Sequence, residues 1–288
     1  MIMRMKKLYL IRMWLLFVAL FAGSCAYAEA SDEDAFSRLE IDLVSLANPL
    51  GISLSAKWFN RQVYHHDKSP LWDGLYYQAG LQANVNPAYS RTGMHLEWLP
   101  IAVLKLRLQY DRYYFSGSNG SLLAFASADD LFGDDELLAR EGDEVSGYGD
   151  RALFHFELRA KLNNVIIRNV TDLAYYQFPG AGPYYLEREY EILMATSDDV
   201  VSNQLFLLFE NKNDNSNYFI GPCYDYVHVR KSGLTRERFG VTGYQEFNDA
   251  IGKLKKPRWY FQSGIYLNER NREDEFYLII GVGGDLNL

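Results

Sequence analysis

The residues that could carry chemistry are charged side chains repeated at every second position along several segments. Neighbouring side chains on a β-strand point to opposite faces, so each set is expected to share one face of a strand. Such a face can line the lumen of a barrel, where ionised side chains select ions and small solutes. The candidate lumen-lining residues are Arg91, His95, Glu97, Lys105, Arg107, Asp111, His155, Glu157, Arg159, Lys161, Glu187, Glu189 and Glu191.

Three of these residues, Glu187, Glu189 and Glu191, form an acidic row, whereas the other segments carry mainly arginine and lysine. Acids on one strand face can line a cation path, as they do in cation-selective pores. An acidic wall opposite a basic wall fits either a small pore with a transverse field or a lumen plugged by ion pairs. Both alternatives stay open, because long side chains can close a narrow barrel.

The elements that must position these side chains are β-strands. From Leu75 to Val85, apolar or small residues alternate with polar residues, a pattern typical of strands with one apolar face. A short amphipathic helix is expected at Tyr244–Lys255. About twelve strands are predicted, with ten as the alternative, and the candidate segments are 39–46, 51–60, 75–85, 88–98, 103–115, 149–162, 165–178, 184–196, 199–211, 217–230, 257–268 and 275–288.

Two all-β architectures fit this pattern, since no segment after residue 28 approaches the roughly 18 apolar residues of a membrane helix. A soluble sandwich or barrel would turn its apolar faces inward, and a membrane barrel would turn them toward lipid. The apolar faces end in aromatic residues such as Trp98, Tyr110 and Tyr114, which suit bilayer interfaces. The sequence therefore favours a transmembrane antiparallel up-and-down β-barrel.

Two short turns predict which polar side chains face each other across neighbouring strands. Opposite charges in facing positions stabilise a strand pair, and unpaired charge in a lumen is costly. Pairing about Ile101 sets Glu97 opposite Lys105, Arg91 opposite Asp111, and His95 opposite Arg107. A two-residue turn at Asn163–Asn164 sets His155 opposite Asp172, and Arg159 opposite Arg168, a like-charge pair that needs a neighbour such as Glu157.

The first 28 residues read as a secretory signal peptide, with a basic start, the apolar run Met13–Ala22 and a predicted cleavage after Ala28. Lipidation of Cys25 is a weaker alternative. Residues 29–38 would form a short lead and residues 39–288 the barrel. Loss of four basic residues with the peptide takes the formal net charge from −8 to −12. This acidity argues against nucleic-acid binding, and Cys223 remains without a disulfide partner.

The signal peptide, the period-two strands and the contrast between short turns and long polar connections resemble Gram-negative outer-membrane β-barrel proteins. The last segment, Phe276–Leu288, alternates apolar residues as the final strand of such proteins does, although it ends in Leu288 and not in an aromatic residue. The resemblance covers roughly residues 39–288 and implies location in the cell outer membrane. It implies three partners: outer-membrane lipid, lipopolysaccharide and the barrel assembly machinery. It also implies that the long connection 116–149 lies outside the cell.

Two clusters of charge lie in connections of this predicted barrel. Asp129–Glu144 holds eight acids against one base, Arg140, yet no spacing matches a calcium-binding loop, so a solvated acidic loop is favoured. Basic residues gather between Arg230 and Arg258, where an ordinary charged connection is favoured over a site for anionic headgroups. No metal site and no cofactor is predicted.

The predicted function is a small porin-like channel for small solutes or a structural envelope protein. An outer-membrane enzyme acting on lipid or lipopolysaccharide is the first alternative, but it would need a nucleophile activated by histidine. His155 is a conceivable base, yet no serine accompanies it and no G-x-S-x-G elbow occurs, so no catalytic residue is assigned. A surface-binding protein using the loop 116–149 is the second alternative.

Overall fold

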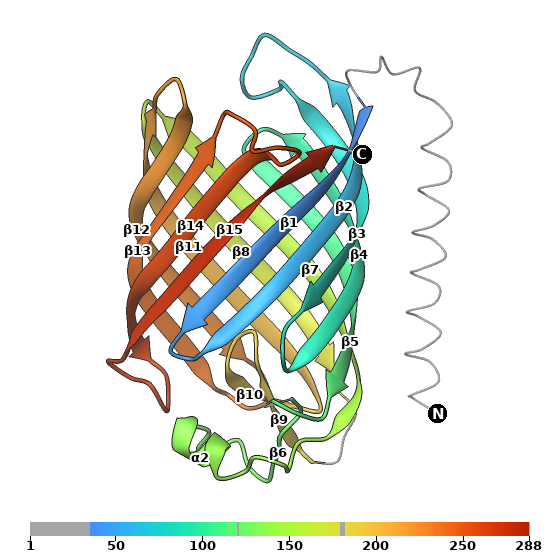
Figure 1. The fold of residues 1–288 in the computed structure, drawn as a ribbon, viewed down its shortest axis with the longest axis vertical. Helices are drawn as coiled ribbons and strands as arrows, with labels where there is room; N and C mark the ends of the chain where they lie inside the picture. The colour runs from blue at the N-terminus through green and yellow to red at the C-terminus, as the bar shows by residue number, and fades with distance from the viewer. Residues whose placement is uncertain (1–34, 120, 179–181, 288) are drawn as a thin grey trace.

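The computed structural model describes residues 35–119, 121–178 and 182–287, and these form a closed antiparallel barrel of twelve strands (Figure 1). The barrel closes where β1 pairs with β15, so Leu43 faces Val282. The predicted all-β barrel is confirmed, while the predicted signal peptide lies outside the described residues. The barrel strands are β1 (Ala35–Ala47), β2 (Gly51–His65), β3 (Leu75–Val85), β4 (Tyr89–Ile101), β5 (Leu104–Ser116), β7 (Ser146–Leu162), β8 (Val165–Gln177), β11 (Ser197–Lys212), β12 (Ser216–Val229), β13 (Thr235–Phe247), β14 (Lys255–Asn268) and β15 (Phe276–Asn287).

The two ends of the barrel differ in the length of their connections. The turn end holds residues 66–74, 102–103, 163–164, 213–215 and 248–254, together with Ala35 and Asn287. The loop end holds residues 48–50, 86–88, 117–145, 178–196, 230–234 and 269–275. Outer-membrane barrels keep short turns on the periplasmic side and longer loops outside, which predicts that the loop end faces out.

The outer surface of the barrel is apolar, as the alternation of the strands predicts. On β11, for example, Val201, Leu205 and Phe209 are exposed on the outer face. Aromatic side chains lie near both ends: Trp98 donates a hydrogen bond to the Tyr64 hydroxyl (3.1 Å) toward the turn end. None of the helices that the structure describes is long and apolar enough to cross a membrane. The predicted outward orientation of the apolar faces is therefore confirmed.

One predicted strand is wrong, and a barrel strand was missed. Segment 184–196 is no barrel strand but contains β9 (Tyr184–Glu187) and β10 (Ile192–Ala195), which form a hairpin in the connection between β8 and β11. The missing strand is β13, whose outward face mixes apolar residues such as Phe239 with polar ones such as Glu237 and Gln245, which hides the alternation. The predicted helix at Tyr244–Lys255 is also wrong, because β13 continues to Phe247 and a turn follows.

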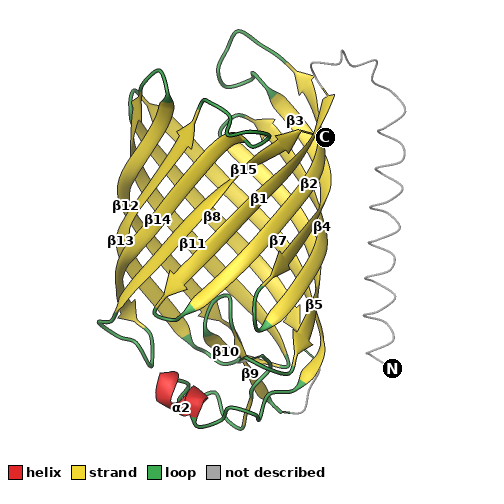
Figure 2. Cartoon of the chain, in the orientation of Figure 1, coloured by secondary structure: helices red, strands yellow, loops and turns green. Residues whose placement is uncertain are grey.

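A small cap covers the loop end of the barrel (Figure 2). Strand β6 (Ala124–Phe125) pairs with β9, so that β10, β9 and β6 form a three-stranded sheet beside the short helix α2 (Asp134–Leu138). Both long connections, 117–145 and 178–196, contribute to this cap. Its apolar core consists of Leu123, Phe125, Phe132, Leu186 and Leu193.

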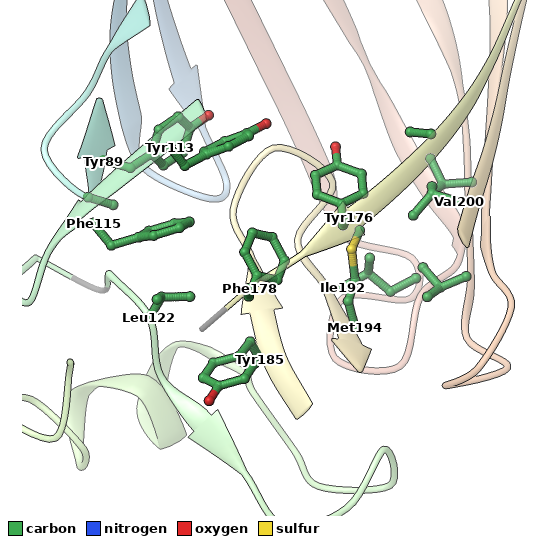
Figure 3. Packing of buried hydrophobic residues seen from close by; sticks show 14 of the residues in the cluster. Tyr89, Tyr113, Phe115, Leu122, Tyr176, Phe178, Tyr185, Ile192, Met194 and Val200 are labelled. Carbon is green, nitrogen blue, oxygen red and sulfur yellow. The ribbon is translucent and has the colours of Figure 1, made fainter. Parts of the chain in front are cut away.

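A second apolar core lies inside the loop-end half of the barrel, where wall and connection residues pack together (Figure 3). Tyr113 and Tyr176 come from the wall, whereas Phe178, Tyr185 and Met194 come from the connection between β8 and β11. Ring centroids of Tyr176 and Phe178 are 5.6 Å apart. The connection therefore fills the lumen at this end instead of extending into solvent.

Candidate functional site

The interior wall of the barrel carries the predicted charged residues of β4, β5 and β7. Alternation places all ten on inward positions, and five of them are buried: His95, Glu97, Asp111, His155 and Glu157. Arg159 and Lys161 lie near the turn end, where Lys161 pairs with Glu210 of β11. Whether these side chains conduct a solute stays a prediction.

The predicted register of the β4–β5 hairpin is wrong by two residues. Glu97 faces Arg107, His95 faces Gln109, and Arg91 faces Tyr113. The strands continue to Ile101 and Leu104, so the turn is centred at residues 102–103, with an irregularity between Trp98 and Ile101. A shift of two keeps every side chain on its predicted face, because the side-chain period of a strand is two.

The predicted register of the β7–β8 hairpin is confirmed. His155 faces Asp172, and His155 Nδ1 lies 2.6 Å from Asp172 Oδ1. Arg159 faces Arg168, and the neighbour that this like-charge pair needs is Glu157, whose Oε2 lies 3.0 Å from Arg168 Nη2. Lys105 reaches the same carboxylate at 2.7 Å.

The acidic row was predicted to lie along a barrel strand, and this is wrong. Glu187 ends β9, and Glu189 and Glu191 lie in the tip between β9 and β10, which we call the plug hairpin (residues 184–195). The pattern of alternating glutamates reflects a tight hairpin whose tip enters the barrel. The predicted acidic wall is thus replaced by a hairpin whose tip contacts inward-facing residues of the barrel wall.

Glu189 anchors the plug hairpin to the barrel wall. Its Oε2 lies 2.5 Å from Arg91 Nη1 and 2.9 Å from Arg151 Nη1. Arg151 also holds the fully buried Asp111, with Nη2 and Oδ2 2.7 Å apart. These charges form a chain from β4 through the hairpin tip to β7 and β5. The hairpin therefore contacts the barrel wall through ion pairs as well as through apolar packing.

Charged residues of β12 and β13 form a second set of contacts with the hairpin tip. This set was not predicted as part of the site. Asp225 is buried and lies 3.0 Å from both Arg236 and Arg238. Arg236 Nη1 donates to the backbone oxygen of Tyr190 (2.5 Å). Arg236 and Arg238 were predicted to lie in a connection, although a spacing of two residues is typical of side chains on one face of a strand.

Glu187 and Glu189 lie outside the membrane-spanning strands, and their pKa values move apart. Burial raises the pKa of Glu187 to about 7, and the negative charge of Glu189 adds to the shift. Burial also opposes ionisation of Glu189, but the guanidinium groups of Arg151 and Arg91 outweigh it and lower the pKa of Glu189 to about 2. One acid of the plug hairpin is thus half-protonated near neutral pH while its neighbour stays ionised.

Ion pairs join the acidic connection, residues 117–145, to the connection between β14 and β15 at the mouth of the barrel. Asp129 lies 3.0 Å from Arg270 Nη2, and Asp134 lies 2.5 Å from Arg272 Nη2. Arg272 also lies 3.7 Å from Glu191 of the plug hairpin. In the described part of the chain, no group of three or more histidine, cysteine or acidic residues could hold a metal ion.

The pair of His155 and Asp172 resembles the base and orienting acid of a hydrolase. A nucleophile would have to lie at His155 Nε2, which is buried and lacks a hydrogen-bond partner among the described residues. The carboxylate of Glu157 lies 3.7 Å from this atom. No described residue places a nucleophile within hydrogen-bond distance of His155 Nε2, where a hydrolase would hold one.

A cavity of about 590 Å³ lies inside the barrel toward the turn end. Its walls come from β7, β8, β11, β12, β13 and β14. The lining residues are Glu157, Arg159, Ile166, Arg168, Phe206, Leu208, Phe219, Thr242, Tyr244, Tyr260 and Gln262. The lumen is thus filled at the loop end and contains a cavity between β7 and β14 toward the turn end.

No protein-family model matches the chain, and no curated protein matches it. Solved structures do match. The chain resembles the β domain of the Bordetella autotransporter BrkA, with 11% identity and a TM-score of 0.40 over 87% of this chain and 98% of that one. It resembles the porin NanC with 5% identity and a TM-score of 0.45, over 87% and 100% of the chains. It resembles an outer membrane channel from Pseudomonas putida F1 with 10% identity and a TM-score of 0.39, over 90% and 100%.

These likenesses concern the fold. The predicted resemblance to Gram-negative outer-membrane β-barrel proteins is confirmed by the structure itself, a closed antiparallel barrel of twelve strands with an apolar outer surface. The chain has the architecture of an outer-membrane β-barrel, and its apolar outer surface and charged interior agree with that architecture.

Proposed function

We propose that the protein is a small-solute channel of the outer membrane, closed at its outer mouth by the plug hairpin. The observation that supports this proposal is the hairpin tip among Arg91, Arg151 and Arg236, with a cavity on its turn-end side. A barrel with a purely structural role has no requirement for a hollow half.

The polar contacts of the hairpin tip can be replaced by hydrogen bonds to water. Buried ion pairs contribute little net stability, because both partners regain hydration when they separate. Glu189 and its two arginines would therefore lose little free energy if the hairpin withdrew. Apolar contacts of Tyr185, Ile192 and Met194 hold the hairpin in place until they are loosened.

The two alternatives have weaker support. The enzyme would need a nucleophile at His155 Nε2, and the described residues supply none. A surface-binding role for the connection 117–145 finds no specific support, since its acids Asp129 and Asp134 are engaged by Arg270 and Arg272.

The channel is tested by the pH dependence of its current in planar lipid bilayers. The pKa of Glu187 is about 7 with the hairpin inserted, against an ordinary value of 4.5, so insertion is linked to proton uptake. Protonated Glu187 stabilises the closed state, in which the hairpin is inserted. This stabilisation is complete below pH 4.5 and is lost as the pH rises through 7. We expect current to rise from about pH 5 to about pH 8, by roughly tenfold for each pKa unit of the shift.

Glu187→Gln should abolish this rise, because the amide does not titrate, whereas Glu136→Gln on α2 should leave it unchanged. A flat profile for the unmodified protein would contradict the role of Glu187. Absence of current from both the unmodified protein and a variant without the plug hairpin would overturn the channel itself.

The membrane-facing surface is tested by placing a charge at mid-strand. Leu205 lies near the middle of β11 and is exposed on the outer face. Leu205→Arg is expected to lower the free energy of unfolding in lipid vesicles by about 2–4 kcal/mol. Gln177→Arg, at the loop end of β8, is the matched control and should cost about 0–1 kcal/mol. Equal costs in urea titrations would mean that the surface around Leu205 does not face lipid.

A further inference from the structure

We propose that the turn-end cavity binds an aromatic carboxylate. This inference deepens the proposed function by naming its solute class, and it rests on that function only for transport, not for binding. The cavity combines an excess of positive charge on one side with a wall of aromatic rings on the other. A planar ring bearing one carboxylate matches both features.

The size of the cavity suits a small organic molecule. Its volume of about 590 Å³ falls within the roughly 300–1,000 Å³ typical of small-molecule sites. Most of the lining residues lie in the half of their strands nearest the turn end. A solute could therefore occupy it while the plug hairpin still closes the loop end.

Cationic side chains outnumber carboxylates on the β7–β8 side of the cavity. The Glu157 carboxylate forms ion pairs with two cations, Lys105 at 2.7 Å and Arg168 at 3.0 Å. Arg159 is exposed, and its Nε donates to the backbone oxygen of Ala102 (3.0 Å). Among the described residues, no carboxylate lies within ion-pair distance of Arg159 or of Arg107.

The neighbouring Arg107 extends this excess of charge. It lies on the inward face of β5 opposite His155, and its Nε is buried without a hydrogen-bond partner in the described part of the barrel. Glu97 of β4 faces Arg107, so the exposed guanidinium group of Arg159 is the cation that an incoming anion would meet first. A carboxylate is the natural partner, because a guanidinium group can bind both of its oxygens.

The opposite wall offers flat aromatic surface. The ring centroids of Phe219 and Tyr244 are 5.7 Å apart. Tyr260 lies against the barrel wall at Gly281, where a Cβ atom would come within 2.2 Å of the tyrosine ring. Phe206 lies beside the charged side, with the Arg168 guanidinium 5.4 Å from its ring centroid. Aromatic surfaces at this spacing favour an aromatic guest through stacked or edge contacts.

The two features together distinguish this ligand from simpler ones. An inorganic anion would meet the arginines but leave the aromatic wall uncovered. A neutral aromatic compound would cover the rings but leave Arg159 without a counter-charge. Only a molecule with both parts satisfies the whole surface of the cavity.

The test is calorimetric titration of the full-length protein in detergent micelles with 2-naphthoate. Two comparison probes are 2-naphthalenemethanol, which keeps the ring without the charge, and acetate, which keeps the charge without the ring. We expect 2-naphthoate to bind at least roughly tenfold more tightly than either probe, since a charge-assisted hydrogen bond contributes on that scale.

Variants then assign the binding to this cavity. Arg159→Gln should weaken 2-naphthoate binding roughly tenfold or more while leaving 2-naphthalenemethanol unaffected. Tyr260→Leu should weaken both aromatic probes. Arg112→Gln, which removes an arginine from the outer face of β5, is the matched control and should change neither.

Outcomes separate the inference from the proposed function. Saturable 2-naphthoate binding that needs Arg159, in a protein that never conducts, would retain the inference and overturn the channel. Conduction without 2-naphthoate binding, or binding that is equal for 2-naphthoate and 2-naphthalenemethanol, would overturn the inference. Binding that is unchanged by both Arg159→Gln and Tyr260→Leu would also overturn it, because the ligand would then lie elsewhere.

Discussion

Replacing the plug hairpin, residues 184–195, with a short glycine–serine linker is expected to turn a mostly closed barrel into an open one. A minor open state typically holds about 0.1–10% of molecules, so its complete release would raise the time-averaged current roughly tenfold or more. The physical reason is removal of the side chains that fill the lumen at the loop end, Tyr185, Ile192 and Met194 among them. The measurement is current through planar bilayers at constant voltage.

The replacement is compatible with the barrel because the ends of β8 and β11 already lie together. The backbone N–H of Phe178 donates to the Thr196 oxygen at 2.8 Å, so a short linker can join the strands. Replacing α2, residues 134–138, with a linker of equal length is the control, since this helix buries no residue. A hairpin variant that folds but carries no more current than the control would show that the hairpin does not close the channel.

Arg151→Met is expected to destabilise the barrel more than any other single substitution considered. Arg151 is only 3% exposed, and Asp111, its partner at 2.7 Å, is 0% exposed. Methionine fills much of the volume but, among the described residues, leaves Asp111 only the side-chain amides of Gln82 and Gln109 as side-chain hydrogen-bond donors. Removing one partner of a buried ion pair costs about 3–5 kcal/mol, because the remaining charge stays desolvated.

Urea unfolding of the barrel in lipid vesicles measures this cost. The matched control is Arg112→Gln, in which an exposed arginine 3.5 Å from Asp150 is lost, with an expected cost of at most about 1 kcal/mol. Adding Asp111→Asn to Arg151→Met should recover part of the loss, since it removes the orphaned charge. Equal stability of Arg151→Met and Arg112→Gln would mean that the charge chain contributes nothing to the fold.

The β4–β5 and β7–β8 hairpins show how much of strand orientation and register can be predicted from the alternation of residues. In both, alternation assigned each charged side chain to the interior, because a strand exposes successive residues on opposite faces. The register was right at Asn163–Asn164, where residues tolerant of positive φ define a two-residue turn and Asn163 adopts a φ of 55°. It was wrong near Ile101, because nothing in the local pattern reveals an irregularity of pairing.

Segment 184–196 shows why local pattern alone does not identify a barrel strand. Its glutamates alternate as they would on a long strand, yet it folds back on itself as β9 pairs with β10. Strand β9 also pairs with β6, a segment about sixty residues earlier, which no local pattern indicates. Strand β13 is the opposite case, a barrel strand that the local pattern did not predict. Its outward face carries Phe239, Val241 and Phe247 but interrupts them with Glu237, Gly243 and Gln245, so the signal fell below that of its neighbours.

The amino-acid sequence by itself determined the architecture and which side chains turn inward, because both follow from a period of two and from the preference of apolar surface for lipid. Only the tertiary structure decided that the lumen is filled at the loop end and that a cavity remains between β7 and β14 toward the turn end. That outcome depends on pairings between segments far apart in the chain, such as Glu189 with Arg91 and Arg151. Such pairings follow from closure of the barrel around the hairpin and leave no local signature.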